Sequence, residues 1–315
     1  MELNNLFLKQ KIMRRVLISL APITLFSIFL FGWRMLVLVA VVTSIGLLAE
    51  YLAMRLINGK AAKISEAVLV TCVLYTLTLP PATPWWVAAI GIAFGVFFGK
   101  GVFGGFGRNI FNPALVARCF VYVSFPAYLT VGWIEPLTRL PGGFARYSAD
   151  VVSAATPMIQ IKTGEAGPGL LNLFFGLISG SSGETSSLLI LLAAVYLIVT
   201  KTASWKIMLS CAGTFAVLST IFHYSGLYAA NPLYSLLSGG FLFATVFMTT
   251  DPISAPTDGW AKIAYGALIA LAAILIRTFS LFTEGIMFAI LFANIFSPLL
   301  DRQLKAFTAR KKVTS

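Results

Sequence analysis

The chain has 315 residues, of which 58% are hydrophobic and only 11% are charged, and its mean hydropathy is +0.90. This composition excludes a water-soluble globular domain and indicates a polytopic membrane protein. The formal net charge of +12 does not require a nucleic-acid partner, because basic loops that face anionic membrane lipid account for it. The three cysteines show neither CxxC nor Cys/His spacing, so the sequence indicates no disulfide framework, iron–sulfur cluster or zinc site.

Apolar runs of about 20 residues are long enough to cross a bilayer as helices. The first run is followed by Trp33 and Arg34 and then by another apolar run, so we expect it to remain as a span and not to be cleaved as a signal peptide. We expect ten spans, near residues 15–33, 35–54, 65–80, 84–99, 112–130, 170–200, 205–224, 233–249, 262–277 and 284–300.

Lysine and arginine are distributed unequally between the two sides of this topology. With the N-terminus in the cytoplasm, the inside segments hold seventeen basic residues and the outside segments five, as the positive-inside rule requires. Both termini are then cytoplasmic, and the loop of residues 131–169 is on the outer side. We expect residues 1–130 to form a first five-helix membrane repeat, and residues 170–315 a second repeat with a basic cytoplasmic tail. Glu50 is expected at the cytoplasmic interface, near Arg55.

Two parts of the chain resemble each other. A proline-rich stretch at residues 79–86 leads into the apolar run 87–98, and a similar stretch at 250–260 leads into the run 263–276. Because each half has an odd number of spans, the two repeats would be inverted across the membrane. Broken spans at matching positions of inverted repeats point to a pathway or binding site near the membrane midplane.

Two glycine-rich breaks are candidates for such an ion pathway. The first, residues 99–113, has five glycines in nine positions but matches neither the Walker A loop nor GxGxxG, and a tight turn between packed helices is the alternative. The second, residues 179–186, places a carboxylate near membrane depth, where ionisable groups are costly and indicate function, although a helix cap is the alternative. The candidate pathway residues are Gly104, Gly105, Asn109, Asn112, Glu184 and Thr185.

Arg118 lies within the fifth predicted span. An arginine there requires a partner, which could be Glu184, helix-terminal carbonyls or the polar groups of a bound cofactor. Asp251 and Asp258 bracket a proline-rich turn, and we expect Asx turns to account for both.

The outer loop carries the sequence Asp150-Val151-Val152-Ser153-Ala154-Ala155-Thr156-Pro157. It fits the pattern Asp-x-x-Ser/Thr-x-Ala-Ser/Thr, which resembles the recognition motif of flavin transferase, the enzyme that esterifies FMN to a threonine hydroxyl. By this resemblance Thr156 is the acceptor, and Asp150, Ser153 and Ala155 are recognised by the transferase. The alternative is structural, because a threonine followed by proline is a good helix N-cap.

Further segments, at residues 103–118, 183–186, 247–255 and 284–294, resemble the family of the Nqr B and Rnf D subunits, and the resemblance covers nearly the whole chain. It implies a ten-helix, inverted-repeat fold similar to ammonium and urea channels, with covalent FMN on the outer side. It further implies a subunit of a Na⁺- or H⁺-translocating electron-transport complex in the bacterial cytoplasmic (inner) membrane. The implied partners are a second FMN-carrying subunit, iron–sulfur subunits and flavin transferase; a second, noncovalent flavin such as riboflavin is left open.

The chain has no dinucleotide fingerprint and no iron–sulfur cysteines, so partner subunits must supply its electrons. Arg139, Arg146 and Lys162 are candidates to stabilise a reduced, anionic flavin. The first span begins near Arg15, without the N-terminal extension common in Nqr B subunits, and this favours the Rnf type, a ferredoxin:NAD oxidoreductase. The alternatives are the B subunit of an Nqr-type NADH:quinone reductase and, from another class, a solute channel without flavin.

Overall fold

A computed structural model describes residues 7–59, 62–130, 132–149, 155–280, 282 and 285–313. It is mostly helical, as the composition predicts for a polytopic membrane protein, and every predicted apolar run contains at least one helix. Among the described residues, four helices are long and apolar enough to cross a membrane: α1 (Lys11–Phe31), α2 (Arg34–Asn58), α10 (Trp205–Tyr224) and α13 (Gly259–Phe279). Shorter apolar helices are α3 (Ala67–Leu77), α4 (Trp85–Val96) with the π-helical turn η3 (Phe97–Gly101), α5 (Pro113–Ser124) and α9 (Ser187–Val199). The last helix, α14, spans Ile286–Val313.

Several predicted spans are broken, and glycines in the left-handed region mark the breaks. Gly176, at φ +90°, ends α8 (Leu170–Phe175), and ten residues separate it from α9. Gly239 and Gly240, at φ +65° and +64°, separate α11 (Pro232–Leu237) from α12 (Phe241–Phe247). The break predicted at residues 179–186 is therefore present. The remaining elements are β1 (Phe7–Leu8), β2 (Ile64–Ser65), α6 (Pro126–Thr130), η4 (Gly142–Ala145) and α7 (Pro157–Lys162), with β1 and β2 paired in parallel.

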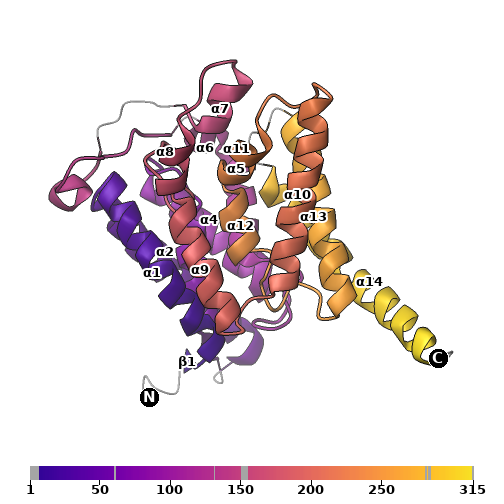
Figure 1. Ribbon diagram of the computed structural model, residues 1–315. Coiled ribbons are helices and arrows are strands. Elements are labelled where there is room, and N and C mark those ends of the chain that lie inside the picture. The colour runs from indigo at the N-terminus through magenta and orange to yellow at the C-terminus, as the bar shows by residue number, and fades with distance from the viewer. Residues whose placement is uncertain are drawn as a thin grey trace.

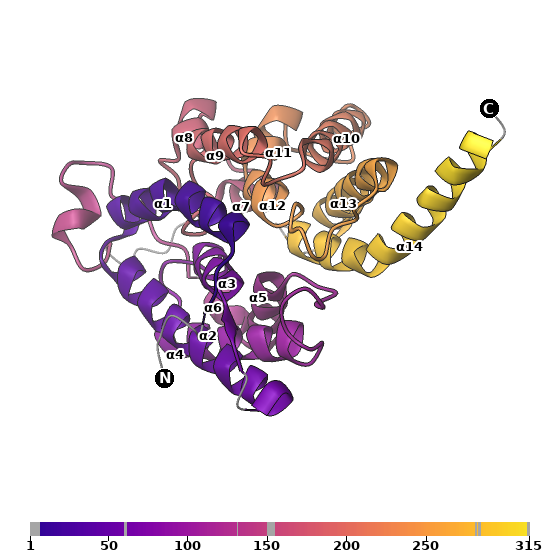
Figure 2. The same ribbon diagram turned by 90° about the horizontal axis from the view of Figure 1, so that it is seen from below.

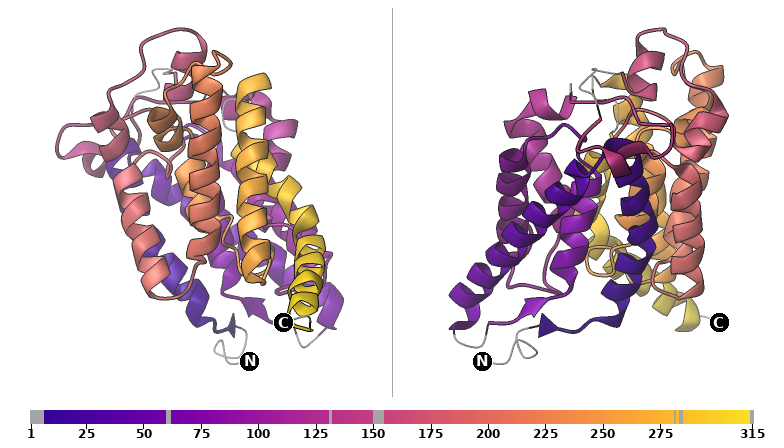
Figure 3. Two further views of the ribbon diagram at one scale, coloured as in Figure 1. Left: turned by 45° about the vertical axis from the view of Figure 1, so that its right-hand side comes forward. Right: turned by 90° about the vertical axis from the view of Figure 1, so that its left-hand side faces the viewer.

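Both termini lie at the same end of the helix bundle (Figures 1 and 3). We call this the terminal end; it includes β1, β2 and the segments 199–205 and 248–258. The opposite end, which we call the loop end, carries α6, α7, α8 and α11 (Figure 1). Seen from the terminal end, α1 to α5 form one group and α9 to α14 a second, with α3 and α12 facing each other where the groups meet (Figure 2).

A single main hydrophobic core runs through both groups. Apolar side chains also cover the outside of the bundle: Leu36 of α2, Val217 of α10 and Ile295 of α14 are 44%, 59% and 57% exposed. A surface this apolar would be costly in water but matches lipid hydrocarbon.

Two charged side chains are buried in the protein. Glu50, predicted at the cytoplasmic interface, is 1% exposed and accepts from Ser65 of β2 at the terminal end, so it is shielded from the interface. The π-helical turn η3 brings Lys100 to it, with Nζ 2.8 Å from Glu50 Oε1, and this buried pair compensates the charge. Arg277, at the end of the predicted span 262–277 and one of the five basic residues that the predicted topology puts outside, is fully buried. It donates to the carbonyls of Ser235 and Gly239, both at 2.7 Å, which the break after α11 leaves without helical partners.

Candidate functional site

A cavity of about 310 Å³ opens beside α7 at the loop end. Three aromatic rings of its wall, Tyr122, Phe282 and Phe288, contact one another with centroids 5.2–5.9 Å apart. Arg118 and Lys162 bring positive charge to the same wall. An aromatic wall with two cations suits a planar, anionic ligand. We call this the loop-end cavity; its lining residues are Arg118, Tyr122, Leu129, Thr130, Trp133, Ile159, Lys162, Thr163, Phe282, Gly285, Met287 and Phe288.

Thr156 is the N-cap of α7. Its Oγ accepts a 3.4 Å hydrogen bond from the backbone N–H of Ile159, and Pro157 occupies the first helical position. The helix cap that the sequence offers as an alternative is therefore present; it does not test flavin attachment, because an esterified oxygen keeps a lone pair for the N–H. Thr156 is 8% exposed and lies one helical turn before Ile159, which lines the loop-end cavity. Of the transferase motif, Asp150 and Ser153 lie outside the described residues and Ala155 is half-buried.

Lys162, on the same short helix, fixes α7 to the end of α13. Its Nζ donates to the carbonyl oxygens of Ser280 and Phe282 at 3.0 and 3.1 Å. Partial burial, together with the positive charge of Arg277, lowers the pKa of the Lys162 ammonium. Lys162 is therefore a cation already engaged with carbonyl dipoles at the rim of the cavity.

Arg118 reaches from the loop-end cavity into the protein interior. Its Nη1 lies 3.0 Å from Oε1 of Glu184, and the two side chains are 5% and 4% exposed. Of the three kinds of partner that the sequence leaves open for Arg118, the structure shows the Glu184 carboxylate. The charges of a buried arginine and a buried carboxylate depend strongly on each other, because water cannot stabilise either one if its partner is lost.

Glu184 lies in the segment between α8 and α9, next to the end of α3 and the start of α12. The segment before it bonds to the end of α3, since the N–H groups of Ser182 and Gly183 donate to the carbonyls of Leu79 and Leu77 at 3.1 and 2.7 Å. On the other side, the Glu184 carboxylate packs against Gly240 at the start of α12, where a Cβ would lie 2.6 Å from Glu184 Cδ. The Glu184 carboxylate therefore contacts the start of α12, and the backbone just before it bonds to the end of α3. We call α3 and α12 the two half-helices, and the place beside Glu184 where the end of one and the start of the other lie the half-helix junction.

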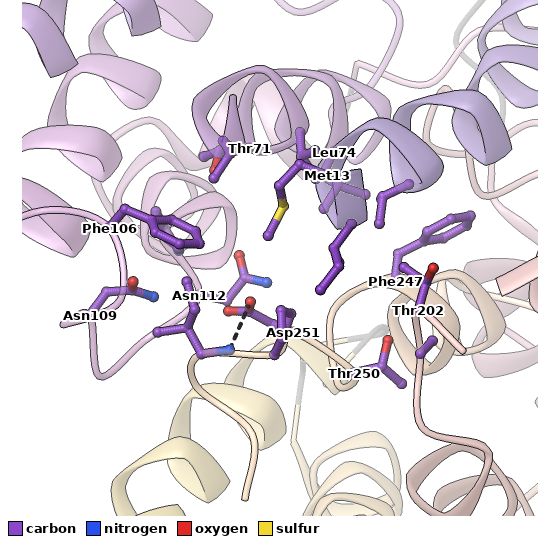
Figure 4. Close-up of a pocket in the computed structure, with 18 of the residues that line it drawn as sticks. Met13, Thr71, Leu74, Phe106, Asn109, Asn112, Thr202, Phe247, Thr250 and Asp251 are labelled. Atoms are coloured by element: carbon purple, nitrogen blue, oxygen red, sulfur yellow. Dashed lines mark hydrogen bonds between the residues drawn. The ribbon is translucent and has the colours of Figure 1, made fainter. Parts of the chain in front are cut away.

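A second, narrower cavity of about 60 Å³ lies at the terminal end (Figure 4). Oxygen-bearing side chains from both groups of helices line it, among them Thr71, Asn109, Asn112, Thr250 and Asp251. The Asp251 carboxylate accepts from Ser254 Oγ at 2.8 Å and from the Ile253 N–H at 3.4 Å, which confirms the predicted Asx turn. Carboxylate, amide and hydroxyl oxygens are the ligands that hard cations prefer. We call this the terminal-end cavity.

The chain matches a protein family. A family model described as NQR2, RnfD, RnfE matches residues 7–309. The chain belongs to this family. Similar relatives, each named as the B subunit of a Na(+)-translocating NADH-quinone reductase, come from Azotobacter vinelandii (41% identical over 246 residues, 76% of this chain and 60% of the relative), Pseudoalteromonas atlantica (42% over 250, 76% and 59%) and Klebsiella pneumoniae (38% over 257, 76% and 59%). The alignments thus cover about three fifths of these relatives.

The structure divides the pathway residues predicted for this NQR2, RnfD, RnfE family member. Asn109 and Asn112 line the terminal-end cavity, whereas Glu184 and the buried Thr185 lie next to the half-helix junction. Gly104 and Gly105 line neither cavity; their left-handed backbone, at φ +98° and +94°, shapes the turn that precedes Asn109.

Sequence reasoning missed three features in this family member. Asp251 lines a cavity, although its Asx turn alone accounted for it, and Lys100 and Glu50 form a buried pair 50 residues apart in the chain. The only local signal was the glycine-rich turn around Lys100, which gives no indication of a partner. Arg277 was likewise recognisable only as a charge near a helix end.

Proposed function

We propose that this chain is the FMN-carrying membrane subunit of a redox-driven sodium pump of the Nqr type. The proposal is supported by family membership and by relatives named as the B subunit of Na⁺-translocating NADH-quinone reductase. These relatives favour the Nqr alternative over the Rnf type. The Rnf type is the second candidate, because the matched family includes RnfD.

The proposed FMN site is Thr156, and the observation that carries it is the position of α7. Thr156 is the N-cap of this helix, and Ile159, Lys162 and the C-cap residue Thr163 line the loop-end cavity. At about 1.5 Å per residue, Ile159 is only about 4.5 Å along the axis from Thr156. A group esterified to Thr156 can therefore reach the cavity without displacing α7.

The residues of the cavity fit such a group. Its volume lies at the lower end of the range of about 300–1,000 Å³ typical of small-molecule sites. Tyr122, Phe282 and Phe288 offer faces and edges for a flat ring, and Arg118 and Lys162 would stabilise added negative charge. Bound FMN would supply electron transfer there, and the protein would tune it through these contacts. Arg139 and Arg146, also considered for this role, are exposed and are absent from the cavity lining. A second, noncovalent flavin stays a prediction.

The proposed topology is ten spans in two inverted repeats, and the packing of the helices supports it. Within the first group α2 packs on α3 and α4, and α4 packs on α5; within the second α10 packs on α12 and α13, and α13 on α14. Each group also has a buried cation bonded to a segment that leads into its short helix. Lys100, after α4, donates to Ser65 before α3, and Arg277 of α13 donates to Ser235 of α11 and Gly239 before α12.

The proposed ion path runs between the two cavities. Sodium would meet oxygen ligands at Asn109, Asn112 and Asp251 in the terminal-end cavity and pass along α3 and α12 toward Glu184 and Thr185. We place the terminal end in the cytoplasm of the bacterial inner membrane and the loop end outside, in line with the distribution of basic residues. Electrons would come from partner subunits of the complex, including iron–sulfur and further FMN-carrying ones, with flavin transferase needed for maturation.

The experiment is co-expression of the chain with a flavin transferase, followed by ultraviolet fluorescence of the denatured polypeptide and its intact mass. We expect a fluorescent band and an FMN adduct that Thr156→Val abolishes. Thr163→Val is the matched control, because Thr163 is the C-cap residue of the same helix and lines the cavity but is not the proposed acceptor. A wild-type chain without fluorescence or adduct would contradict the proposal and favour a solute channel. Persistence of the adduct in Thr156→Val would show that the attachment site is wrong.

A further inference from the structure

The Arg118–Glu184 pair lies between the two cavities. Arg118 lines the loop-end cavity and binds Glu184 at 3.0 Å. Gly183, next to Glu184, bonds to the carbonyl of Leu77, and Leu74, one turn earlier on α3, lines the terminal-end cavity. Leu77, which bonds to Gly183, is therefore only about 4.5 Å along the helix axis from Leu74 in the wall of the terminal-end cavity.

We propose that Arg118 and Glu184 couple negative charge in the loop-end cavity to proton uptake at Glu184, beside the junction of α3 and α12. The inference rests on the proposed function, since it takes reduction of FMN as the source of that charge. Arg118 lines the cavity, and its guanidinium binds the Glu184 carboxylate. An anion formed in the cavity competes with Glu184 for this cation.

Burial of the pair makes Glu184 bind a proton when Arg118 turns to the anion. Both side chains are at most 5% exposed, so a carboxylate that loses its cation has little water to stabilise its charge. Glu184 then binds one proton from bulk water, forming an O–H bond, as electrons from the partner subunits reduce the group in the cavity. Reoxidation removes the anion, restores the ion pair and releases the proton. Net charge in the buried region stays nearly constant through the cycle.

The location gives this exchange a mechanical consequence. The Glu184 carboxylate packs against the backbone of Gly240, and the preceding residues bond to the last carbonyls of α3. A change in charge at Glu184 therefore acts directly on the start of α12, and through the backbone of Gly183 on the end of α3. Their other ends reach the terminal-end cavity, since Ala67 of α3 and Val246 and Phe247 of α12 line it.

The test is reduction-induced infrared difference spectroscopy on the flavinylated chain in detergent, with dithionite as the reductant. The wild type should gain a C=O band of a protonated carboxylic acid on reduction. Glu184→Gln should lose the band, because no carboxyl is present to protonate. Arg118→Gln should also lose it, because Glu184 without its cation is protonated in both redox states. The flavin midpoint potential should depend less steeply on pH in both variants.

Glu165→Gln is the matched control, because it removes the same charge from an exposed position of the outer loop. It should keep both the band and the wild-type pH dependence. Bound, reducible FMN without a carboxylic acid band in the wild type, or a band that persists in Glu184→Gln, would overturn the coupling. Fluorescence of the denatured chain, measured first, reports separately whether FMN is attached, and its absence would contradict the proposed function itself.

Discussion

The buried pair of Lys100 and Glu50 gives the sharpest prediction for stability. The two charges lie 2.8 Å apart and are 3% and 1% exposed. At an effective dielectric constant of about 20 their attraction is about 6 kcal/mol, but each ion also loses several kcal/mol of hydration, so the pair as a whole contributes little. Removing one partner leaves the other charge buried and alone, which costs about 3–5 kcal/mol.

We therefore expect Glu50→Gln and Lys100→Met each to lose about 3–5 kcal/mol of unfolding free energy, and the double variant to lose no more than either single one. Unfolding in mixed detergent–dodecyl sulfate micelles, followed by fluorescence of the six tryptophans, measures these values. The pair of Arg14 and Glu66 is the matched control, because Arg14 is 52% exposed and solvent screening leaves its coupling to Glu66 much weaker than that of the buried pair. Additive losses in the Lys100/Glu50 cycle would refute the reasoning.

Three other predictions concern single contacts. Gly240→Ala should cost clearly more than Gly107→Ala: both residues have a left-handed backbone, worth about 1–2 kcal/mol, but only at Gly240 would the new Cβ collide with Glu184, and equal melting temperatures would contradict this. Asp258→Ala should cost about 1 kcal/mol in the same unfolding assay, because it removes the cap on the N–H groups of Trp260 and Ala261; no loss would mean that the cap contributes nothing. The Arg14 guanidinium lowers the pKa of Glu66, so this contact should stabilise fully above about pH 4.3 and be lost as the pH falls through the lower folded-state value. Glu66→Gln should remove that acid dependence of the melting temperature, and an unchanged profile would count against it.

Local sequence was sufficient for the helices and several of their ends. Apolar length determines where a chain can cross a bilayer, so every predicted run contains a helix. Caps are equally local: Asn112 and Thr156 each precede a proline, and each accepts a backbone N–H of its own helix. The breaks after Gly176 and at Gly239 follow from residues that tolerate left-handed backbone.

The partners of the charged residues depended on tertiary structure. Arg118 and Glu184 are 66 residues apart in the chain, and only their suspected burial suggested that they meet. The partners of Lys100 and of Arg277 gave no such signal, because an ammonium in a glycine-rich turn, or a guanidinium in the last turn of a helix, looks the same whether it faces water or a buried acceptor. The residues of the predicted ion pathway lie in two separate places for the same reason. Asn109 and Glu184 each lie in a glycine-rich break, but the fold puts Asn109 at the terminal-end cavity and Glu184 beside Arg118 of the loop-end cavity.

The sequence by itself thus determined that the chain is a membrane protein, where its helices run and which family it resembles, since hydropathy, caps and motifs are properties of neighbouring residues. Only the tertiary structure decided which charges are buried in pairs, that Asp251 lines a cavity, and that α7 places Thr156 one turn before a residue of the loop-end cavity. These depend on contacts between residues tens of positions apart, whose energies come from desolvation and packing that no local pattern records.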